Sequence, residues 1–210
     1  MLKRLCDIVI SVVALILLLP VFAIVAILIK LDSPGPVFFR QLRVGFHGQL
    51  FRIFKYRTMV VNAEKLGGPS TTADDRRITR SGKWIRRFNL DELPQLMNVL
   101  KGEMSLVGPR PEVPQYAALF RGAEKEILSV RPGLTDWATL WNIDEGAVLA
   151  GDADPERAYL ELIRPEKIRL QLEYVKRRSF WVDLVILVQT VIAVVLRTKP
   201  EALRLREHRQ

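Results

Sequence analysis

Residues 8–29 read IVISVVALILLLPVFAIVAILI, an apolar run interrupted only by Ser11 and Pro20. At about 1.5 Å per residue, a helix of this length can cross the hydrocarbon core of a bilayer. A cleaved signal peptide fits poorly, because the run is too long and no small-residue cleavage site follows it. We therefore expect residues 1–31 to form a membrane element that stays in the protein.

Pro20 lies near the middle of this run and predicts a break, because a proline inside a helix removes a hydrogen bond and kinks the axis. The residues leave two shapes open, a single transmembrane helix that tolerates the proline and a re-entrant helix that returns to its own side. Both flanks carry positive charge, so the positive-inside rule does not orient a spanning helix. The flanking cations are Lys3, Arg4, Lys30, Arg40 and Arg43.

A second apolar stretch covers residues 180–196 and contains Asp183 and Gln189. It is short for a span, and aromatic residues at one end with basic residues at both suit a helix at the membrane interface. The alternative is a helix packed in the domain's own core. We place an amphipathic interfacial helix at residues 180–197 and a charged, loosely ordered tail at residues 198–210.

Residues 32–179 are expected to form one catalytic core of the α+β class, mostly helical. Residues 37–44 and 50–59 are rich in β-branched and aromatic residues and flank Gly45-Phe46-His47-Gly48, which predicts a short β-hairpin. Alternation in the second strand puts Lys55 and Arg57 on one face. Helical patterns begin at about residue 78 and recur at residues 159–178.

Composition supports one domain with a partner of negative charge. The chain has 210 residues, and 32 Lys and Arg against 23 acidic residues give a net charge of +9. Nucleic acid, an anionic membrane surface and a phosphorylated substrate all fit that charge. We interpret Cys6, the one cysteine, as a small buried hydrophobic residue. With only two histidines, the chain has few ligands for a zinc site.

The candidate chemistry lies in residues 82–112, beginning with the run LDELPQ at residues 90–95. Pro94 suits a first helical turn, which places Asp91 beside a helix N-terminus, where phosphate or an anionic side chain is stabilised. The alternative is that Asp91 only caps the helix. Asp91 and Glu92 point about 100° apart on a helix, so they do not form one shared dyad. A buried stripe is expected from Leu90, Leu93, Leu96, Met97 and Leu100.

Three arginines accompany these carboxylates. Arg86 lies just upstream, and Arg110 sits in Gly108-Pro109-Arg110-Pro111, a stiff turn that presents a guanidinium suited to phosphate. Arg131 precedes Pro132-Gly133 on a third turn. No Walker A motif is present. Carboxylates, a helix N-terminus and arginines beside a membrane helix suit phosphoryl transfer to a lipid, with a divalent cation held by Asp or Glu.

The chain resembles the monotopic phosphoglycosyl transferases of the bacterial sugar transferase family. The motifs that carry the resemblance follow the family's order over nearly the whole chain: Lys3-Arg4 with Asp7, the proline-broken membrane helix, GPVFF (35–39), FKYRTM (54–59), LDELPQ (90–95), MSLVGPRP (104–111) and RPGLT (131–135). Larger members carry extra N-terminal membrane helices, so this chain resembles the minimal form.

The resemblance implies transfer of a sugar-1-phosphate from a UDP-sugar to undecaprenyl phosphate with release of UMP, the first membrane step of exopolysaccharide, O-antigen, capsule or glycoprotein glycan synthesis. Asp91 would form a covalent phosphosugar and hold Mg²⁺, with Glu92 beside it in a supporting role. Arg86 and Arg110 would neutralise phosphate oxygens, and Lys55 and Arg131 are further candidate phosphate ligands. The resemblance also implies a re-entrant helix, both ends in the cytoplasm and the bacterial inner membrane, and it leaves a homodimer open.

The chain departs from the family pattern at two places. Many members have Ser before the helix-breaking proline, where this chain has Leu19. A serine hydroxyl helps to satisfy the backbone groups that lose their hydrogen bonds at the break, so its loss affects the geometry of the break. Many members read Gly-Trp or Gly-Leu where this chain has Asp136-Trp137. We expect the distinctive region from Asp136 through Pro155 to govern sugar selectivity.

Two other classes compete with a transferase. A non-catalytic membrane scaffold that binds anionic lipid explains the charge and the apolar segments, but it gives no reason for Asp-Glu beside fixed arginines. A nucleic-acid binder explains the pI of about 10.0. However, the basic residues are spread along the chain without a recognised nucleic-acid motif, so we expect no nucleic-acid partner.

Overall fold

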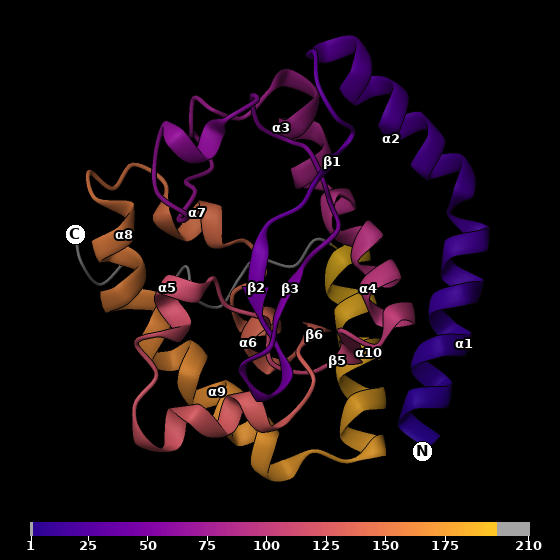
Figure 1. The fold of residues 1–210 in the computed structure, drawn as a ribbon, viewed down its shortest axis with the longest axis vertical. Coiled ribbons are helices and arrows are strands. Elements are labelled where there is room, and N and C mark those ends of the chain that lie inside the picture. The colour runs from indigo at the N-terminus through magenta and orange to yellow at the C-terminus, as the bar shows by residue number, and fades with distance from the viewer. Residues whose placement is uncertain (1, 197–210) are drawn as a thin grey trace.

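The structure is a computed structural model and describes residues 2–196. It is mostly helical with a few short strands, as the sequence predicts (Figure 1). The first two helices are α1 (Leu2–Leu17) and α2 (Leu19–Asp32), which meet at an angle of 62°. The break falls at Leu18, and Pro20 stands in the first turn of α2, so the predicted break near Pro20 is confirmed. Within residues 2–196 no single helix passes the length and hydropathy test for a membrane span, whereas α1 and α2 pass it together.

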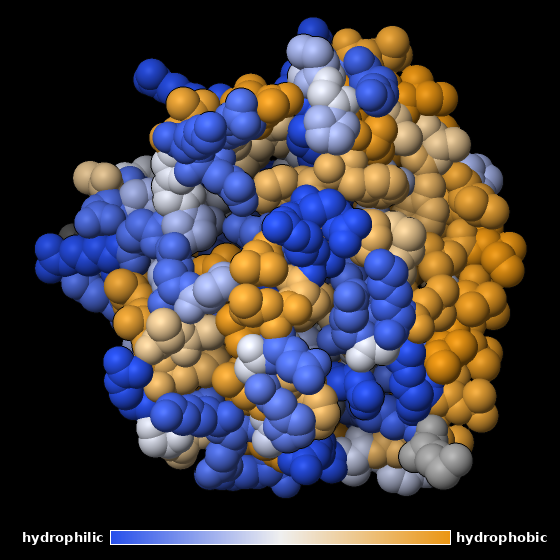
Figure 2. All heavy atoms as spheres, in the orientation of Figure 1, coloured by the Kyte–Doolittle hydropathy of each residue, from blue (hydrophilic) through white to orange (hydrophobic). Residues whose placement is uncertain are grey.

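Helix α1 has a polar side that holds it against the core. Asp7 accepts hydrogen bonds from Ser105 Oγ at 2.9 Å and from the backbone N–H of Leu106 at 3.2 Å. Arg4 donates to the backbone oxygen of Val99 at 2.6 Å, near the end of the neighbouring helix. The other side of α1 and most of α2 are exposed and apolar. Figure 2 shows these apolar side chains gathered along the edge that the two helices form.

The predicted hairpin forms, but as two short ladders. Strand β1 (Phe38–Phe39) pairs with β4 (Lys55–Tyr56), and β2 (Leu42–Val44) pairs with β3 (Leu50–Arg52), both antiparallel. Each pair of residue numbers adds up to 94, so the two ladders share one continuous register. The 3₁₀ turn η1 (Phe46–Gly48) connects the hairpin, with His47 at φ 53°. The hairpin places the Lys55 side chain in the interior of the molecule.

Arg57 is buried and serves a different purpose from its neighbour Lys55. Its guanidinium donates to the backbone oxygens of Pro36 at 2.6 Å, Pro34 at 2.9 Å and Ser33 at 2.9 Å, and to Ser33 Oγ at 2.8 Å. The turn that ends α2 is therefore tied to the hairpin. Gly35, at φ 120°, adopts a conformation in this turn that other residues rarely adopt.

The segment with the candidate carboxylates begins after α3 (Arg80–Arg87). Residues Leu90–Gln95 form a 3₁₀ helix, η3, which continues as α4 (Leu96–Lys101). The expected buried stripe is wrong except at Leu96, because Leu90, Leu93, Met97 and Leu100 are only half-buried. The tighter 3₁₀ turn shifts the phase of the helix relative to a period of 3.6 residues. The buried positions in this segment are Asp91, Pro94, Gln95, Leu96, Asn98 and Val99.

A short parallel pair lies beneath this segment. Strands β5 (Ser105–Val107) and β6 (Gly133–Thr135) approach so closely that a Cβ on Gly133 would lie 2.1 Å from the backbone nitrogen of Gly108. The main hydrophobic cluster surrounds this pair and includes Met104, Val107, Tyr174 and Ile186. Glycine at 133 therefore lets the turn after β5 pack directly on β6.

The second half of the chain is helical and closes the core from the other side. Its elements are α5 (Pro114–Ala117), η4 (Gly122–Ser129), α6 (Trp137–Trp141), α7 (Glu145–Leu149), α8 (Pro155–Ala158), the π-helical turn η5 (Tyr159–Ile163), α9 (Arg164–Arg177) and α10 (Phe180–Leu196). One further short turn, η2 (Ala63–Lys65), lies in the first half, in the loop before α3. The helical stretch predicted for residues 159–178 corresponds to η5 and α9.

Helix α10 packs partly in the core, which is one of the two alternatives that its sequence left open. Ile186 is buried in the core, and the buried Asp183 accepts a hydrogen bond from Tyr174 Oη at 2.8 Å and pairs with Lys3 of α1. The other faces of α10 expose apolar residues such as Trp181. Residue 197 and the predicted tail, residues 198–210, lie outside the described residues.

Candidate active site

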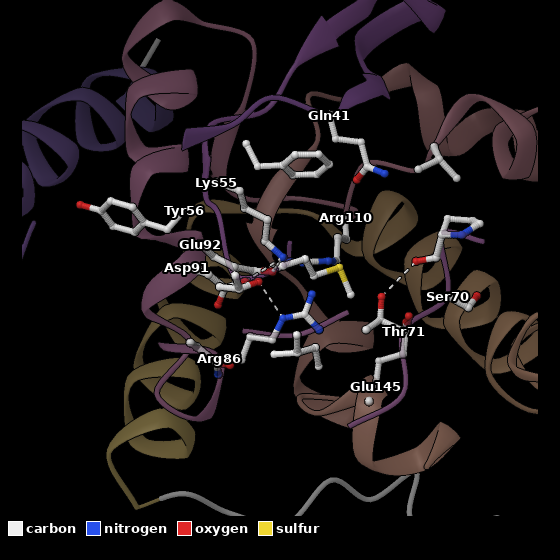
Figure 3. A pocket seen from close by; sticks show the side chains of 18 of the residues that line it. Gln41, Lys55, Tyr56, Ser70, Thr71, Arg86, Asp91, Glu92, Arg110 and Glu145 are labelled. Carbon is white, nitrogen blue, oxygen red and sulfur yellow. Dashed lines mark hydrogen bonds and ion pairs between the residues drawn. The ribbon is translucent and has the colours of Figure 1, made fainter. Parts of the chain in front are cut away.

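A cavity of about 1580 Å³ opens between the hairpin, η3, the turn after β5 and the loop that precedes α3 (Figure 3). Five of the predicted site residues line it: Lys55, Arg86, Asp91, Glu92 and Arg110. They come from four separate parts of the chain, and the fold brings their charged groups to one end of the cavity. Ser70, Thr71 and Glu145 line its other end.

Asp91 stands in the first turn of η3, as the position of Pro94 predicts. The turn begins at Asn89, whose φ of 53° is in the left-handed region that asparagine tolerates better than most residues. Asp91 is 5% exposed. A carboxylate this buried needs a charged or hydrogen-bonding partner in place of water.

Lys55 supplies that partner. Its ammonium nitrogen lies 3.0 Å from Oδ2 of Asp91 and 3.0 Å from Oε1 of Glu92. Asp91 and Glu92 are neighbours in the turn, and one cation from the facing strand β4 contacts both carboxylates. This bridge fixes the orientation of Asp91 relative to the rest of the site.

Arg110 binds the second carboxylate through both of its terminal nitrogens. Its Nη1 donates to Oε2 of Glu92 at 2.7 Å, and its Nη2 donates to Oε1. Burial alone would raise the pKa of Glu92, but Arg110 and Lys55 hold that pKa well below its usual value. Glu92 is therefore an anion in the neutral range, and it holds the guanidinium at the edge of the cavity.

The turn that presents Arg110 is held by hydrogen bonds from two other elements. The backbone N–H of Gly133 donates to Pro109 at 3.0 Å, and the amide of Gln171 donates to the backbone oxygen of Arg110 at 3.4 Å. Strand β6 and helix α9 thus hold the turn from two sides. The guanidinium has little freedom to leave the cavity.

Arg86 also reaches the cavity, from the last turn of α3. Its Nε donates to Thr58 Oγ1 at 2.9 Å, and its terminal nitrogens bond to no residue within 2–196. Both terminal nitrogens of Arg86 are therefore open to a ligand. Thr58 was not singled out from the sequence, although it directly follows Arg57 in the FKYRTM motif.

The structure does not bring Arg131 to this group. Its Nε donates to the backbone oxygen of Gly102 at 3.0 Å, and its guanidinium lies 5.5 Å from the centre of the Phe46 ring. Arg131 is not among the residues that line the cavity. Here it joins the turn before β6 to the end of α4 and to the hairpin turn.

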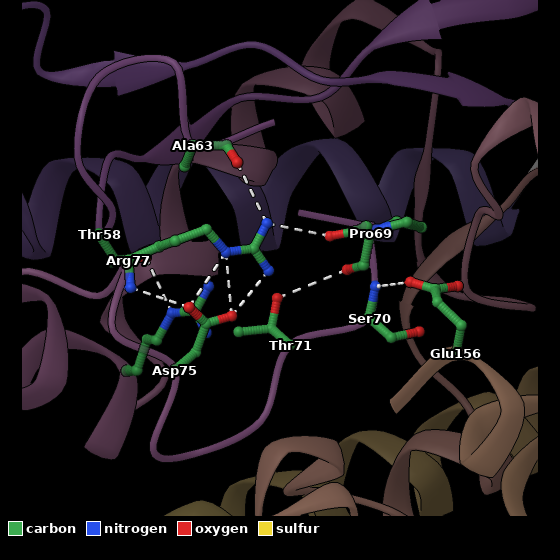
Figure 4. Close-up of polar contacts among 10 residues, drawn as sticks. Thr58, Ala63, Pro69, Ser70, Thr71, Asp75, Arg77 and Glu156 are labelled. Atoms are coloured by element: carbon green, nitrogen blue, oxygen red, sulfur yellow. Dashed lines mark hydrogen bonds and ion pairs between the residues drawn. The ribbon is translucent and has the colours of Figure 1, made fainter. Parts of the chain in front are cut away.

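The loop at residues 62–77 forms one wall of the cavity and is held by an ion pair and by hydrogen bonds (Figure 4). Arg77 pairs with Asp75 at 2.7 Å and donates to the backbone oxygens of Ala63 and Gly68, each at 3.1 Å. Glu156 of α8 accepts from the backbone N–H of Ser70 at 2.8 Å. These contacts fix the loop across the polar end of the cavity, and sequence spacing does not reveal them.

A buried ion pair lies behind the same end. Lys167 Nζ is 2.5 Å from Oε1 of Glu112, and Tyr159 Oη contacts both partners at 3.1 Å. Burial would raise the pKa of Glu112, but Lys167 lowers it. Burial would lower the pKa of Lys167, but Glu112 raises it. Both groups are therefore charged at neutral pH.

The donor set fits a magnesium ion that a substrate helps to hold. Among residues 2–196, no three His, Cys, Asp or Glu side chains converge as ligands for a metal. Mg²⁺ typically takes one or two protein carboxylates, and water and substrate phosphates complete its octahedron. Asp91 and Glu92 are adjacent and line the cavity, and Oδ1 of Asp91 has no partner within the described residues.

Comparison with known proteins gives consistent results. The sequence model of the bacterial sugar transferase family matches residues 1–197. The chain is 43% identical over 196 residues to an undecaprenyl-phosphate glucose phosphotransferase of Komagataeibacter xylinus, covering 90% of this chain and 35% of that protein. It is 39% identical to a UDP-glucose:undecaprenyl-phosphate glucose-1-phosphate transferase of Escherichia coli K12, covering 91% and 39%.

A third relative is closer in length. The chain is 37% identical to the exopolysaccharide production protein ExoY of Sinorhizobium fredii, covering 92% of this chain and 85% of that protein. By contrast, the chain spans 35% and 39% of the lengths of the Komagataeibacter and Escherichia transferases.

Proposed function

The chain belongs to the bacterial sugar transferase family, and from that premise we propose that it transfers a sugar-1-phosphate from a UDP-sugar to undecaprenyl phosphate and releases UMP. The observation that carries the proposal is the contact of Lys55 with both Asp91 and Glu92 at the end of a large cavity. A buried carboxylate, fixed by a cation beside further arginines, is suited to attack on a phosphate.

In the first step, an oxygen of the Asp91 carboxylate attacks the β-phosphorus of the UDP-sugar. The bond between that phosphorus and the bridging oxygen breaks, and UMP leaves with the bonding electron pair. The product is a sugar phosphate bound covalently to Asp91. Division into two displacements replaces one difficult encounter by two easier ones.

In the second step, an oxygen of undecaprenyl phosphate attacks the same phosphorus. The bond between phosphorus and Asp91 breaks, which restores the carboxylate and leaves the sugar on a lipid diphosphate. Each displacement moves one phosphoryl group from one oxygen to another, so no oxidant or further reactant is needed.

The cations at the cavity edge would stabilise the charge that builds up on the phosphate oxygens in both steps. Arg86 has two open terminal nitrogens, and Arg110 is held in place by Glu92. This arrangement gives Glu92 a supporting role, because it positions Arg110 and shares Lys55 with Asp91. Fixed donors of this kind need no reorganisation when the charge develops.

Magnesium is part of the proposal. Asp91, with Glu92 beside it, would hold the ion, which would offset negative charge on the donor diphosphate. Its involvement is tested by titrating Mg²⁺ into metal-free protein and following both activity and thermal stability. Stabilisation by Mg²⁺ that is lost in Asp91→Asn supports this assignment, and equal stabilisation of both proteins contradicts it.

We also propose that α1 and α2 form a re-entrant element in the bacterial inner membrane, with the catalytic core on the cytoplasmic face. The 62° break at Leu18 and the apolar surface of both helices support this geometry. A test uses Cys6→Ser with a single cysteine placed at Leu2 or Ser33. In intact cells, both positions should resist an impermeant thiol reagent, whereas a spanning helix would expose one of them.

The polar end of the cavity is proposed to bind the donor's sugar and nucleotide hydroxyl groups. Glu145 lines this end, and its carboxylate pairs with no residue within 2–196. The adjacent Gly146 accepts a hydrogen bond from the backbone N–H of Ala73 at 2.9 Å, which holds α7 against the loop wall. These residues lie within the region expected to govern sugar selectivity, residues 136–155.

The test is UMP release by detergent-solubilised protein given a panel of UDP-sugars, undecaprenyl phosphate and Mg²⁺. Lipid-dependent release from one donor, lost in Asp91→Asn, would support the proposal and identify the sugar. Glu126→Gln is the control, since Glu126 is an exposed carboxylate that does not line the cavity. Full activity of Asp91→Asn, or no release from any donor by folded wild-type protein, would overturn the proposal.

A further inference from the structure

The cavity that holds Asp91 also reaches the inner side of helix α10. Leu187, Thr190 and Val194 of α10 line it, with Leu134 of β6 and Ala138 of α6. The three α10 residues are spaced by three and four positions, so they lie on one face of the helix. The catalytic group and an apolar helix therefore border the same cavity.

The two hydroxyl groups in this part of the wall are hydrogen-bonded within the protein. Thr190 Oγ1 donates to the backbone oxygen of Ile186 at 2.8 Å and lies 2.7 Å from Thr135 Oγ1, the second threonine at the wall. With the Thr190 proton directed at Ile186, Thr135 donates to Thr190. Both hydroxyl protons are thus used within the protein, so this wall suits a hydrocarbon.

The outer side of the same helix is apolar as well. Val188, Val191, Ile192 and Val195 are between 48% and 70% exposed. A helix with exposed apolar residues outside and a cavity inside lies between a lipid phase and the reaction centre. Val194 marks the point where the two meet, since it lines the cavity and is 38% exposed.

We propose that the polyprenyl chain of the lipid acceptor lies along the inner face of α10, on Leu187, Thr190 and Val194, with its phosphate directed at Asp91. This inference rests on the proposed function and adds the path of the acceptor. The phosphate then meets Lys55, Arg86 and Arg110, while the hydrocarbon stays among apolar side chains. The polar end of the cavity is left for the donor.

The opposite edge of the cavity is a poorer path. Phe38 and Val61 line it and are partly exposed. However, the Phe38 ring stacks on Tyr56 at 5.4 Å and meets Phe54 edge-on at 6.2 Å. The buried guanidinium of Arg57 also borders this edge. Aromatic stacking and a cation leave less apolar surface there for a flexible chain.

The test compares Val194→Trp with Ile192→Trp in the full chain, reconstituted with undecaprenyl phosphate. Positions 192 and 194 differ by about 200° around the helix, so the control places the same bulk on the outer side. Val194→Trp should raise the KM for undecaprenyl phosphate about tenfold, equivalent to roughly 1.4 kcal/mol. Ile192→Trp should change it by less than about twofold, or roughly 0.4 kcal/mol.

A second readout separates the acceptor step from the donor step. Exchange of labelled UMP into UDP-sugar needs no lipid, and Val194→Trp should retain it at the wild-type rate. That result also shows that the variant is folded. Val194→Asn adds polarity without bulk and should raise the same KM, so the test does not depend on the tryptophan variant alone.

Equal effects of Val194→Trp and Ile192→Trp would overturn the proposal, because they would indicate a general loss of membrane docking. An unchanged KM in both Val194 variants would overturn it as well. A larger effect of Val61→Trp would place the acceptor at the opposite edge. Absence of UMP exchange in the wild type would contradict the covalent mechanism of the proposed function. The other three outcomes would contradict only the path of the acceptor.

Discussion

The ammonium nitrogen of Lys55 lies 3.0 Å from Oδ2 of Asp91. This contact joins the hairpin to the first turn of η3, and it is made where both side chains are mostly buried, with 20% and 7% of their surfaces exposed. An ion pair at this depth is screened much less than a surface pair. Lys55 therefore sets the position of the proposed nucleophile.

Replacement of Lys55 by methionine should slow the first step strongly. The change keeps most of the apolar stem but removes the charge that orients Asp91 and would meet the phosphate. We expect UMP exchange to fall by about 10²–10³-fold, the usual cost of losing one fixed donor. Lys101→Met is the control, since Lys101 ends α4 outside the cavity lining and should keep exchange near the wild-type rate. Equal rates for Lys55→Met and wild type would contradict the role of Lys55.

Arg110→Gln should shift the acid limb of the pH profile upward. In the wild type, Arg110 and Lys55 hold the pKa of Glu92 below its usual value of 4.5, although burial opposes them. Without Arg110, only Lys55 opposes the effect of burial, so the pKa of Glu92 rises. Glu92 then takes up a proton at a higher pH and releases Lys55 earlier as the pH falls.

The measurement for Arg110 is kcat/KM for UDP-sugar between about pH 3.5 and 8, a range that brackets the usual carboxyl pKa. Arg52→Gln, an exposed change in β3, should leave the shape of the profile unaltered. An Arg110→Gln profile that is lower but unshifted would mean that Glu92 does not control the acid limb.

The sequence predicts the parts of the site that depend on local rules. Pro20 breaks the first helix within two residues of its own position, and Pro94 places Asp91 in a first turn. The two prolines around Arg110 present its guanidinium at the cavity. Each of these features depends on a restricted backbone, which proline imposes in any fold.

Other features depend on contacts between distant segments, and spacing alone does not reveal them. Arg131 resembles Arg110 in sequence, with a proline and a glycine nearby, yet it faces Gly102 and Phe46. The stripe expected from Leu90 to Leu100 assumed an α-helical period, and the 3₁₀ turn at Leu90–Gln95 changed which residues face inward. The contact of Glu156 with Ser70 joins residues 86 positions apart.

Glu145→Gln should weaken the donor complex. If the free carboxylate accepts hydrogen bonds from donor hydroxyl groups, loss of its charge should raise the KM for UDP-sugar by about tenfold, in line with a charged hydrogen bond of roughly 1.5 kcal/mol. The KM for undecaprenyl phosphate should stay unchanged, since the acceptor lies elsewhere in the cavity. Asp144→Asn is not a suitable control, because Asp144 caps α7.

Two altered donors distinguish which hydroxyl groups Glu145 contacts. In the wild type, a donor that lacks the contacted hydroxyl group should have a raised KM. If a 2′-deoxyuridine donor has no raised KM in Glu145→Gln, Glu145 contacts the ribose. If a donor with an epimeric sugar behaves in this way, Glu145 contacts the transferred sugar. Additive penalties for both donors would exclude a direct contact of Glu145 with either group.

Lys167→Met should destabilise the fold, and a second change should restore it. Lys167 and Glu112 have side chains that are 11% and 7% exposed and lie 2.5 Å apart, so removal of the lysine leaves a buried carboxylate without its partner. We expect a loss of about 3 kcal/mol in the free energy of unfolding, measured in detergent. Glu112→Gln combined with Lys167→Met removes both charges and should recover most of that loss. Arg169→Met, which breaks surface pairs with Glu166 and Glu173, should cost less than about 1 kcal/mol.

The pH dependence of unfolding provides an independent check on the Glu112–Lys167 pair. The pKa of Glu112 is lowered, so its stabilisation is complete above its usual value of 4.5 and disappears as the pH falls through the folded value. The pKa of Lys167 is raised, so its stabilisation is complete below its usual value of 10.5 and disappears as the pH rises through the folded value. The difference in unfolding free energy between wild type and the double variant should therefore stay constant between these limits and decline on the acid side. A difference that grows as the pH falls below 4.5 would mean that the pair does not stabilise the folded state through its charges.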